Sequence, residues 1–378
     1  MHRRVSIILF RMFHYRVDFL TLLEAELKKH SVTLDVYYGK PTPESLAKND
    51  TGTLKGSTEV ISWCLPIAGK EILLQIPPRR ILASNLIICM QENRLLINYF
   101  LQLYTRIAPS TRFAFWGHGR NFQSQSATGV RERLKQYLLR GSDWFFAYTE
   151  SSKASLIESG YSLENITVFN NTIDTETFSE AIHNITADQK QDFLRELSVD
   201  SDKHIGIFCG SMYPAKRIVE LLEASRLIKE KVPDFHLICI GDGPSASVIK
   251  DALPACEWIH FLGSQKGLKK ALAYSVGKLV LNPGLVGLHI VDSFSAGVPM
   301  LTMEYDYHSP EFAYIRSNEN GLVTEADVPT YANSAVTLLT EPLLQKRLAD
   351  GARLSAKEYS LQSMVDKFAA GILDAVES

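Results

Sequence analysis

Two cations beside a glycine-bearing turn are the first residues whose types and spacing suit chemistry. The segment GSMYPAKR follows an apolar run that ends at Cys209 and Gly210, and a helix is predicted to begin near Pro214. Gly210 lets the backbone approach a ligand closely, and Lys216 and Arg217 fall on the first helical turn. Cations, backbone N–H groups and a helix N-terminus are the partners that phosphate oxygens need. The alternative is two solvated charges on an exposed turn.

Other polar residues follow predicted strands in the same way. In FAFWGHGRN, His118 comes just after a strand, between Gly117 and Gly119. Its imidazole could hydrogen-bond a hydroxyl or meet developing charge, or it could simply cap a turn. Asp292 stands near the start of a predicted helix, where a carboxylate could accept hydrogen bonds from a diol or merely favour the helix dipole. The turn GDGP, Gly241–Pro244, has permissive glycines at a sheet edge.

Short apolar strands alternate with amphipathic helices along the whole chain and would position these residues. The expected strands include Val5–Phe10, EILLQI, NLIICM, RFAFWG and WFFAYT, and helices are expected over Asp18–Lys29, RLLINYFLQLYTRI and GVRERLKQYLLRG. Such alternation predicts parallel sheets with right-handed crossovers. The fold class is therefore α/β with doubly wound sheets, in which ligands bind at the carboxyl ends of the strands.

The length and composition suit a globular protein of two domains. The 378 residues are 46% hydrophobic and 22% charged, with a net charge of -2, which argues against nucleic acid as a partner. Residues 1–190 hold 22 Lys and Arg against 18 Asp and Glu (+4), and residues 191–378 hold 18 against 24 (-6). A mildly basic first half is compatible with contact to an anionic membrane, or with ordinary surface charge.

The cysteines and the N-terminus favour a cytoplasmic protein. Five cysteines, three of them in apolar runs, indicate reduced thiols with no metal-binding spacing. MHRRVSIILF is interpreted as a first strand, and no apolar stretch approaches the ~20 residues of a membrane helix. We expect domains at 1–185 and 186–357, with a C-terminal helix over 358–378. The expected localisation is cytoplasmic, with peripheral contact at the inner face of the membrane.

The succession of motifs over roughly residues 165–375 resembles family 4 glycosyltransferases of the GT-B fold. TVFNNTIDTETF is similar to the stretch before the donor domain of that family, and GSMYPAKRIVELLEA is similar to its phosphate loop and helix. FHLICIGDGP, WIHFLG, LVLNPGLVGLHIVDSFSAGVPMLT and YIRSNENGLV follow in family order. The first half is similar in pattern only, and WGHGRN is its one good match.

The resemblance implies two Rossmann-like domains facing across a cleft, with the C-terminal helix returning to the first domain. It implies a retaining transferase that uses a nucleotide-sugar donor, with UDP expected on frequency, and needs no metal or other cofactor. The acceptor would be a hydroxyl of a glycan or lipid-linked saccharide in polysaccharide or cell-surface glycan synthesis. The leaving phosphate itself is thought to help deprotonate the acceptor in that family.

The resemblance also assigns residues, with departures. Lys216 falls on the phosphate-binding lysine, Ser211 replaces the usual arginine, and Asp292 falls on the second glutamate, which binds ribose. Gly284 replaces the first glutamate, so the loop from Gly284 to Leu288 would contact the sugar through backbone N–H groups or be a plain turn. The full assignment is Gly210, Ser211, Lys216 and Arg217 for diphosphate; Gly284, Leu285, Val286, Gly287, Leu288 and Asp292 for sugar and ribose; His118 and Asp292 for catalysis; Gly241, Asp242, Gly243, His14 and Arg16 lining the cleft; and Glu92 and Asn93 on the acceptor side.

Three other interpretations stay open. An inverting transferase of the same architecture would use His14 or Glu92 as general base. A non-catalytic partner subunit would explain the changes at Ser211 and Gly284. A nucleotide-sugar epimerase would need acidic pairs around the sugar, which Gly284 argues against. His289, at the start of the helix that holds Asp292, is as compatible with a structural role as with a functional one.

Overall fold

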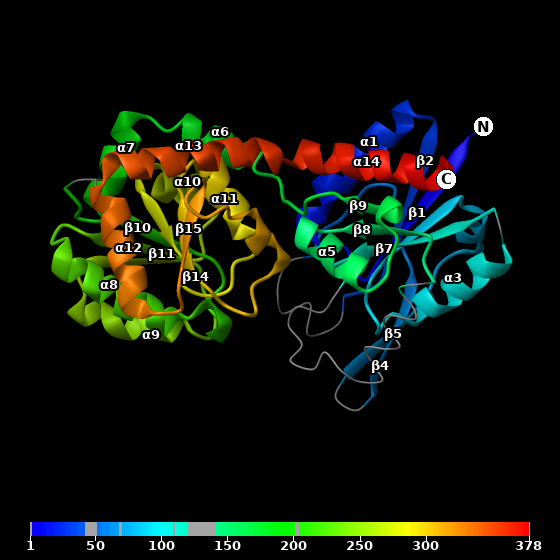
Figure 1. Ribbon diagram of the computed structural model, residues 1–378, viewed down its shortest axis with the longest axis horizontal. Coiled ribbons are helices and arrows are strands. Elements are labelled where there is room, and N and C mark those ends of the chain that lie inside the picture. The colour runs from blue at the N-terminus through cyan, green and yellow to red at the C-terminus, as the bar shows by residue number, and fades with distance from the viewer. Residues whose placement is uncertain are drawn as a thin grey trace. The chain divides into compact units, whose positions relative to one another are not determined.

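The chain forms two compact units, each built on its own parallel sheet (Figure 1). The computed structural model describes residues 2–41, 51–67, 70–108, 110–119, 139, 141–200 and 204–377. The first unit comprises residues 1–173 and 361–378, and the second comprises residues 174–360. The helix expected over GVRERLKQYLLRG lies almost wholly outside the described residues.

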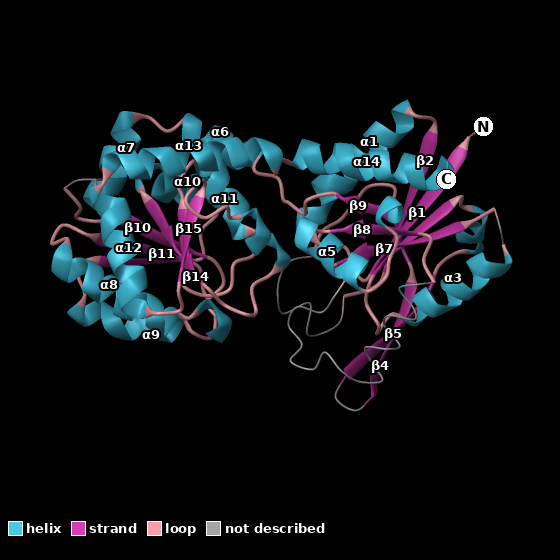
Figure 2. Cartoon of the chain, viewed as in Figure 1, coloured by secondary structure: helices cyan, strands magenta, loops and turns pink. Residues whose placement is uncertain are grey.

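The first unit contains a seven-stranded parallel sheet in the order β3-β2-β1-β6-β7-β8-β9. Its strands are β1 (Arg3–Leu9), β2 (Val32–Tyr38), β3 (Thr58–Glu59), β6 (Leu86–Met90), β7 (Arg112–Gly117), β8 (Trp144–Ala147) and β9 (Ile166–Val168). Its helices are α1 (Val17–Lys29), α3 (Leu96–Ile107), α5 (Glu150–Glu158) and α14 (Leu361–Glu377), with short 3-10 turns η1 (His14–Arg16), η2 (Arg79–Ala83) and η3 (Leu163–Asn165). The strands in the middle of the sheet, β1, β6, β7 and β8, are mostly buried because helices cover both faces, whereas the edge strand β3 is exposed (Figure 2).

The C-terminal helix α14 belongs to the first unit, as the fold prediction stated. It packs against α1, and its Phe368 ring stacks on Phe146 of β8 with ring centroids 4.2 Å apart. The side chain of Phe368 also contacts Phe19 and Trp116. The last helix of the chain therefore completes the core that the first strand begins.

One predicted strand is in a different place. EILLQI lies in β5 (Lys70–Ile76), which pairs antiparallel with β4 (Ile61–Ile67) in a two-stranded hairpin outside the parallel sheet. The prediction of parallel pairing was wrong for this run because two strands separated by a very short link can pair only as a hairpin. Figure 1 shows this hairpin extending away from the sheet.

The second unit has a six-stranded parallel sheet in the order β12-β11-β10-β13-β14-β15. Its strands are β10 (Ile205–Cys209), β11 (His236–Ile240), β12 (Ile259–Gly263), β13 (Leu279–Leu281), β14 (Met300–Met303) and β15 (Gly321–Thr324). Its helices are α6 (Glu176–His183), α7 (Ala187–Glu196), α8 (Ile218–Lys231), α9 (Ala246–Ala252), α10 (Gly267–Val276), α11 (His289–Ala296), α12 (Val328–Thr340) and α13 (Pro342–Glu358), with turns η4 (Pro214–Lys216), η5 (Leu253–Ala255) and η6 (Pro310–Tyr314). This strand order is that of a dinucleotide-binding Rossmann fold.

The boundary between the units differs from the expected one. Residues 174–185 were assigned to the first domain, but α6 packs against α10 and α11 of the second unit. The Ser295 hydroxyl on α11 also donates a hydrogen bond to the Thr175 carbonyl at 3.2 Å. The expected boundary was misplaced because the polar composition of this segment resembles that of a linker. The helices that it packs against lie far away in sequence.

Candidate functional site

The candidate site of the second unit lies where its strand order reverses. The chain leaves β10 toward β11 on one side, and β13 lies on the other side of β10. The loops that follow the carboxyl ends of β10 and β13 therefore meet at the topological switch point. Ligands of doubly wound sheets bind at this point.

The loop after β10 is held by the GDGP turn through backbone contacts. The Gly210 N–H donates to the Ile240 carbonyl and the Met212 N–H to the Asp242 carbonyl, both at 2.9 Å. A Cβ at Gly241 would lie 1.9 Å from the Gly210 oxygen, and one at Gly243 would lie 2.4 Å from the Met212 oxygen. The GDGP glycines thus allow close backbone contact between the two loops. This contact fixes the position of Gly210.

Lys216 is the buried cation of this site. Its side chain is 4% exposed, and its Nζ donates to the Leu285 carbonyl at 2.5 Å and lies 3.4 Å from His289 Nδ1. A Cβ at Gly210 would meet only the Lys216 side-chain end, at 3.9 Å, so the ammonium group lies beside bare backbone. No carboxylate of the described residues forms an ion pair with it. Burial lowers the pKa of Lys216 to about 7.

Arg217 and Ser211 occupy different surroundings from Lys216. Arg217 has a left-handed backbone (φ 54°) and begins α8, and its guanidinium pairs with Glu220 at 2.9 Å and lies 5.8 Å from the Tyr305 ring. Ser211 is exposed. Of these three neighbouring candidates, only Lys216 directs its side chain to the loop after β13.

The loop after β13 is joined to the Lys216 turn by its backbone. The Leu285 N–H donates to the Ala215 carbonyl at 2.8 Å, and Asn282 Nδ2 donates to the Gly284 carbonyl at 2.9 Å. A Cβ at Gly284 would lie 2.3 Å from the Ala215 oxygen and 2.5 Å from the Lys216 carbonyl carbon. Position 284 therefore has no room for any side chain, which gives a steric reason for the missing glutamate.

Only part of this loop offers free N–H groups. The Leu285 N–H is used by Ala215, and the Val286 N–H donates to His308 Nδ1 at 3.0 Å. Within the described part of the chain, the N–H groups of Gly287 and Leu288 have no acceptor, and α11 begins directly after them without a side-chain cap. These N–H groups and the Lys216 side chain belong to adjoining turns, and both are partners of the kind that anions need.

His308 fixes the loop conformation and was not identified from the sequence. Its Nε2 donates to the Met303 carbonyl at 2.9 Å, its Nδ1 accepts from Val286, and its ring stacks on Phe312 at 4.0 Å. Both nitrogens are thus used by the neutral imidazole. Burial lowers the pKa of His308 to about 4. Nothing in the sequence around it signals this role.

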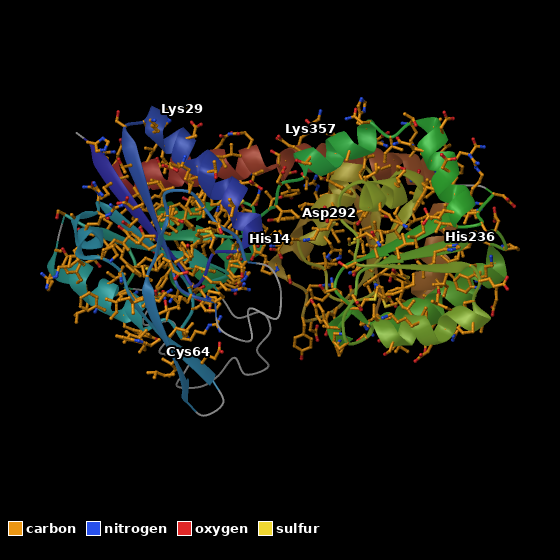
Figure 3. All side chains as sticks on the ribbon, turned by 180° about the vertical axis from the view of Figure 1, so that it is seen from behind. His14, Lys29, Cys64, His236, Asp292 and Lys357 are labelled. Carbon is orange, nitrogen blue, oxygen red and sulfur yellow. The ribbon has the colours of Figure 1, made fainter. Side chains whose placement is uncertain are left out.

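Asp292 forms a buried ion pair that was also not foreseen. It lies on the first turn of α11, where Figure 3 labels it. Its Oδ2 is 2.8 Å from Lys270 Nζ on α10, with the two side chains 9% and 19% exposed. Burial raises the pKa of Asp292, and the Lys270 ammonium opposes that rise. Lys270 also lies 4.5 Å from the Phe178 ring. The carboxylate is held in one orientation by a partner far away in sequence.

In the first unit, Arg16 and His118 come together at the carboxyl edge of the sheet. The Arg16 side chain is 4% exposed, its guanidinium lies 4.7 Å from the Trp116 ring, and its Nη2 donates to the Tyr148 hydroxyl at 3.4 Å. It forms no ion pair within the described residues, and its Nη1 has no hydrogen-bond partner there. The exposed His118 ring lies 4.2 Å from the Tyr148 ring, and His14 is exposed beside Tyr15.

The residues predicted for the acceptor side line a small pocket after β6. Glu92 accepts a hydrogen bond from Arg94 Nε at 2.5 Å, and Asn98 Nδ2 donates to the Met90 carbonyl at 2.9 Å. Asn98 Oδ1 is buried without a partner in the described region. The pocket is lined mostly by amide, carboxylate and phenol groups: Gln91, Glu92, Asn93, Asn98, Tyr99, Gln102, Phe115 and Leu139. Such groups suit a polyhydroxyl ligand.

Residues 203–341 match the sequence profile of the family described as "Glycosyl transferases group 1". The second unit contains a group 1 glycosyltransferase domain. A sequence relative of this chain is EpsD of Bacillus subtilis (strain 168), whose glycosyltransferase activity is itself inferred, at 25% identity over 169 residues. That similarity covers 42% of this chain and 43% of the relative, so it spans less than half of each protein.

Solved structures similar to this chain cover nearly all of it. A glycosyltransferase from Rickettsia africae ESF-5 superposes with a TM-score of 0.69 at 16% identity, over 98% of both chains. Anabaena Alr3699/HepE in complex with UDP superposes with a TM-score of 0.68 at 14% identity, over 98% of this chain and 99% of that one. The predicted α/β fold with two Rossmann-like domains of GT-B type is confirmed by these likenesses.

Two negative findings concern the described residues alone. No helix among them has the length and apolar character needed to cross a bilayer. Among the same residues, no three or more His, Cys, Asp or Glu side chains gather in a way that could hold a metal ion.

Proposed function

We propose that this chain is a glycosyltransferase that moves a sugar from a nucleoside-diphosphate sugar, a UDP-sugar, to a hydroxyl of a glycan or lipid-linked saccharide. The observation that supports it most is Lys216, a buried ammonium group without a carboxylate partner in the described residues. It lies beside free N–H groups at the start of α11, at the switch point of a group 1 glycosyltransferase domain. Solved relatives in complex with UDP support the choice of base.

In the proposed reaction, these groups stabilise the leaving diphosphate. The bond between the anomeric carbon and the diphosphate oxygen breaks, and the acceptor oxygen bonds to the same carbon. The acceptor proton passes to the departing phosphate. The Lys216 ammonium and the N–H groups of Gly287 and Leu288 would meet the charge that develops on the diphosphate, which is where preorganised donors lower a barrier most.

The other assignments follow from this site. Asp292, oriented by Lys270, would accept hydrogen bonds from the ribose hydroxyls, and His118 and Arg16 would contribute from the first unit. Retention, metal independence, a role in polysaccharide or cell-surface glycan synthesis and a cytoplasmic site of action are parts of the same proposal, and the sequence resemblance supports them.

Calorimetric titration with UDP, GDP, dTDP and ADP, with and without magnesium, tests the donor site. We expect one nucleotide to bind without metal, and Lys216→Met to weaken it by at least about tenfold, since a charge-assisted hydrogen bond is worth ~1.5–3 kcal/mol. Lys250→Met on α9, an exposed lysine of the same unit, is the matched control. Absence of binding by every nucleotide would favour a non-catalytic partner subunit instead.

The pH dependence of binding tests the same group. The pKa of Lys216 is about 7 in the free protein, and a nearby diphosphate favours the charged form and raises that pKa. Binding therefore takes up a proton above pH 7, and affinity should fall as pH rises from 7 toward 9. Lys216→Met should lack this dependence.

The anomeric configuration of the product, read by NMR, separates retention from inversion with His14 or Glu92 as base.

A further inference from the structure

The helix α3 exposes an apolar stripe and buries a face that mixes apolar and polar residues. Its exposed positions include Leu96, Phe100, Leu103 and Ile107, with exposed fractions of 38%, 57%, 62% and 77%. Their spacing of four, three and four residues places them in one narrow stripe along the helix. Its buried positions are the polar residues Asn98, Gln102 and Thr105 and the apolar residues Ile97 and Leu101. The exposed apolar side chains of α3 therefore contribute little to the core of the first unit.

The neighbouring hairpin of β4 and β5 also exposes apolar residues. The register pairs Ile61 with Ile76, Trp63 with Leu74 and Leu65 with Ile72, and paired residues share one face of an antiparallel ladder. All six residues of these pairs are apolar, and Ile61, Trp63, Leu65 and Ile76 are 59%, 52%, 47% and 45% exposed. The opposite face turns Gln75 and Leu73 into the protein, 2% and 3% exposed.

The two apolar faces belong to adjacent elements. β5 packs against α3, and the Leu73 N–H donates to the Arg94 carbonyl at 2.8 Å, just before α3 begins. We call the eight exposed residues the apolar face of the first unit: Ile61, Trp63, Leu65, Ile76, Leu96, Phe100, Leu103 and Ile107. Exposed apolar groupings of this size on soluble proteins mark interaction surfaces.

The charge around this face indicates what it contacts. Residues 60–112 contain six Lys and Arg and two Asp and Glu, an excess of four positive charges. Arg79, Arg80 and Arg106 are exposed, whereas both acids, Glu71 and Glu92, are half-buried and lie within ion-pair distance of Arg94. Arg80 pairs with Asp35, and the exposed Glu59 lies just before β4, so positive charge exceeds negative charge beside the apolar face without being alone there.

We propose that the first unit binds the surface of an anionic lipid bilayer through this apolar face. Apolar side chains that include Trp and Phe, bordered by arginines, are the combination that enters the headgroup boundary of anionic membranes. A symmetric dimer on the same face would bring the same arginines of two copies together, which opposes self-association. The proposal does not depend on the enzymatic function, but it would bring a lipid-linked acceptor to the pocket that the inner side of α3 lines.

Vesicle flotation tests the proposal with the full chain. Wild type should float with phosphatidylcholine vesicles that contain phosphatidylglycerol and much less with phosphatidylcholine alone. Phe100→Glu with Leu103→Glu should reduce the bound fraction by at least about tenfold, because charged groups do not enter the bilayer interior. Arg79→Glu with Arg106→Glu should remove the preference for anionic lipid. The matched control is Leu343→Glu with Leu354→Glu on α13, at positions 86% and 66% exposed, and it should float like wild type.

A second readout guards against misfolded variants. Trp63 is exposed on the hairpin, so its fluorescence should shift to shorter wavelength when anionic vesicles are added to wild type, and Trp63→Phe should lose that shift. Circular dichroism and UDP titration should be unchanged in the α3 variant. Failure of wild type to float, equal loss in the α13 control, or a wild-type dimer that the α3 variant dissociates would each overturn the proposal, the last by showing a face between two copies.

Discussion

The two sheets place a buried basic residue after their first strands, but they hold it in different ways. In the second unit, Lys216 is held by a backbone carbonyl, and its neighbours are main-chain atoms and an imidazole. In the first unit, Arg16 lies among the rings of Trp116, Tyr148 and Tyr15. A lysine in this position changes its charge near neutral pH, whereas an arginine keeps its charge at any pH that the protein experiences.

The difference indicates which residues each unit requires and which it can exchange. The second site depends on close backbone contact, which requires glycine at 241, 243 and 284 and leaves side chains such as Ser211 free to change. The first site depends on particular aromatic side chains gathered from several strands. Glycine patterns are visible in a sequence and aromatic clusters are not, which is why the family resemblance is clear only in the second half.

The largest expected effect is on the backbone-built site. Gly284→Ala places a Cβ 2.3 Å from the Ala215 oxygen, and backbone cannot give way as a side chain can. We expect a loss of about 3 kcal/mol or more in the free energy of unfolding, measured with urea, and loss of nucleotide binding. Gly287→Ala is the control, since its nearest neighbours would be 3.7 and 3.9 Å away, and it should cost less than about 1 kcal/mol. Equal losses would contradict the steric account.

The next effect concerns the buried ion pair of the second unit. Asp292→Asn leaves the Lys270 ammonium without its counter-charge and should lower the free energy of unfolding by about 1–3 kcal/mol. Adding Lys270→Met should recover part of that loss, because no unpaired charge then remains. A double-mutant cycle measures the coupling, and additive effects of the two changes would show that the pair is not formed in solution.

Lys216→Met should increase stability while it weakens nucleotide binding. The folded pKa of about 7 lies below the ordinary 10.5, so the unfolded chain holds an extra proton between these values and wild-type stability rises with pH across them. The variant lacks this slope. Its gain should be about 1–3 kcal/mol at pH 7 and shrink toward pH 10. A gain that does not change with pH would show that the lysine is charged throughout.

The smallest change in the free energy of unfolding is expected for Arg16 in the first unit, and it distinguishes Arg16 from Lys216. Arg16→Met removes a cation–π contact and also a buried charge, and these partly cancel, so the free energy of unfolding should change by less than about 1 kcal/mol. Because arginine does not titrate, the change should be the same from pH 6 to pH 9. A pH-dependent change would mean that a titrating neighbour is coupled to Arg16.

Much of the fold could be predicted because its signals are local. Alternating apolar runs and amphipathic segments identified β1, β6, β7, β8 and most of the second sheet, and parallel sheets followed from that alternation. The hairpin and the boundary at residue 174 were missed for non-local reasons. β5 has the composition of a buried strand, and α6 has the composition of a linker, but each is placed by contacts that sequence periodicity does not encode.

The site divides in the same way. Motif spacing marked Lys216, Gly210 and the 284–288 loop, and the structure brings these segments together, while their roles stay predictions. Lys270 and His308 were missed because their contacts are with other elements: Lys270 pairs with Asp292, and His308 hydrogen-bonds with Val286 and Met303. The change at Gly284 could be noticed in the sequence as a lost glutamate. Its cause, contact with the backbone of residues 215 and 216, needed coordinates.

The crowding at Gly284 has an evolutionary consequence. A lineage with glycine here cannot regain a glutamate by one substitution, because any side chain would first require the turn at 215–216 to move. That turn carries Lys216, so an intermediate that moved it would displace the lysine proposed to bind phosphate before gaining the acid. The two loops must change together or remain as they are. Descendants of this protein should therefore diversify their sugar contacts at other positions and keep this glycine.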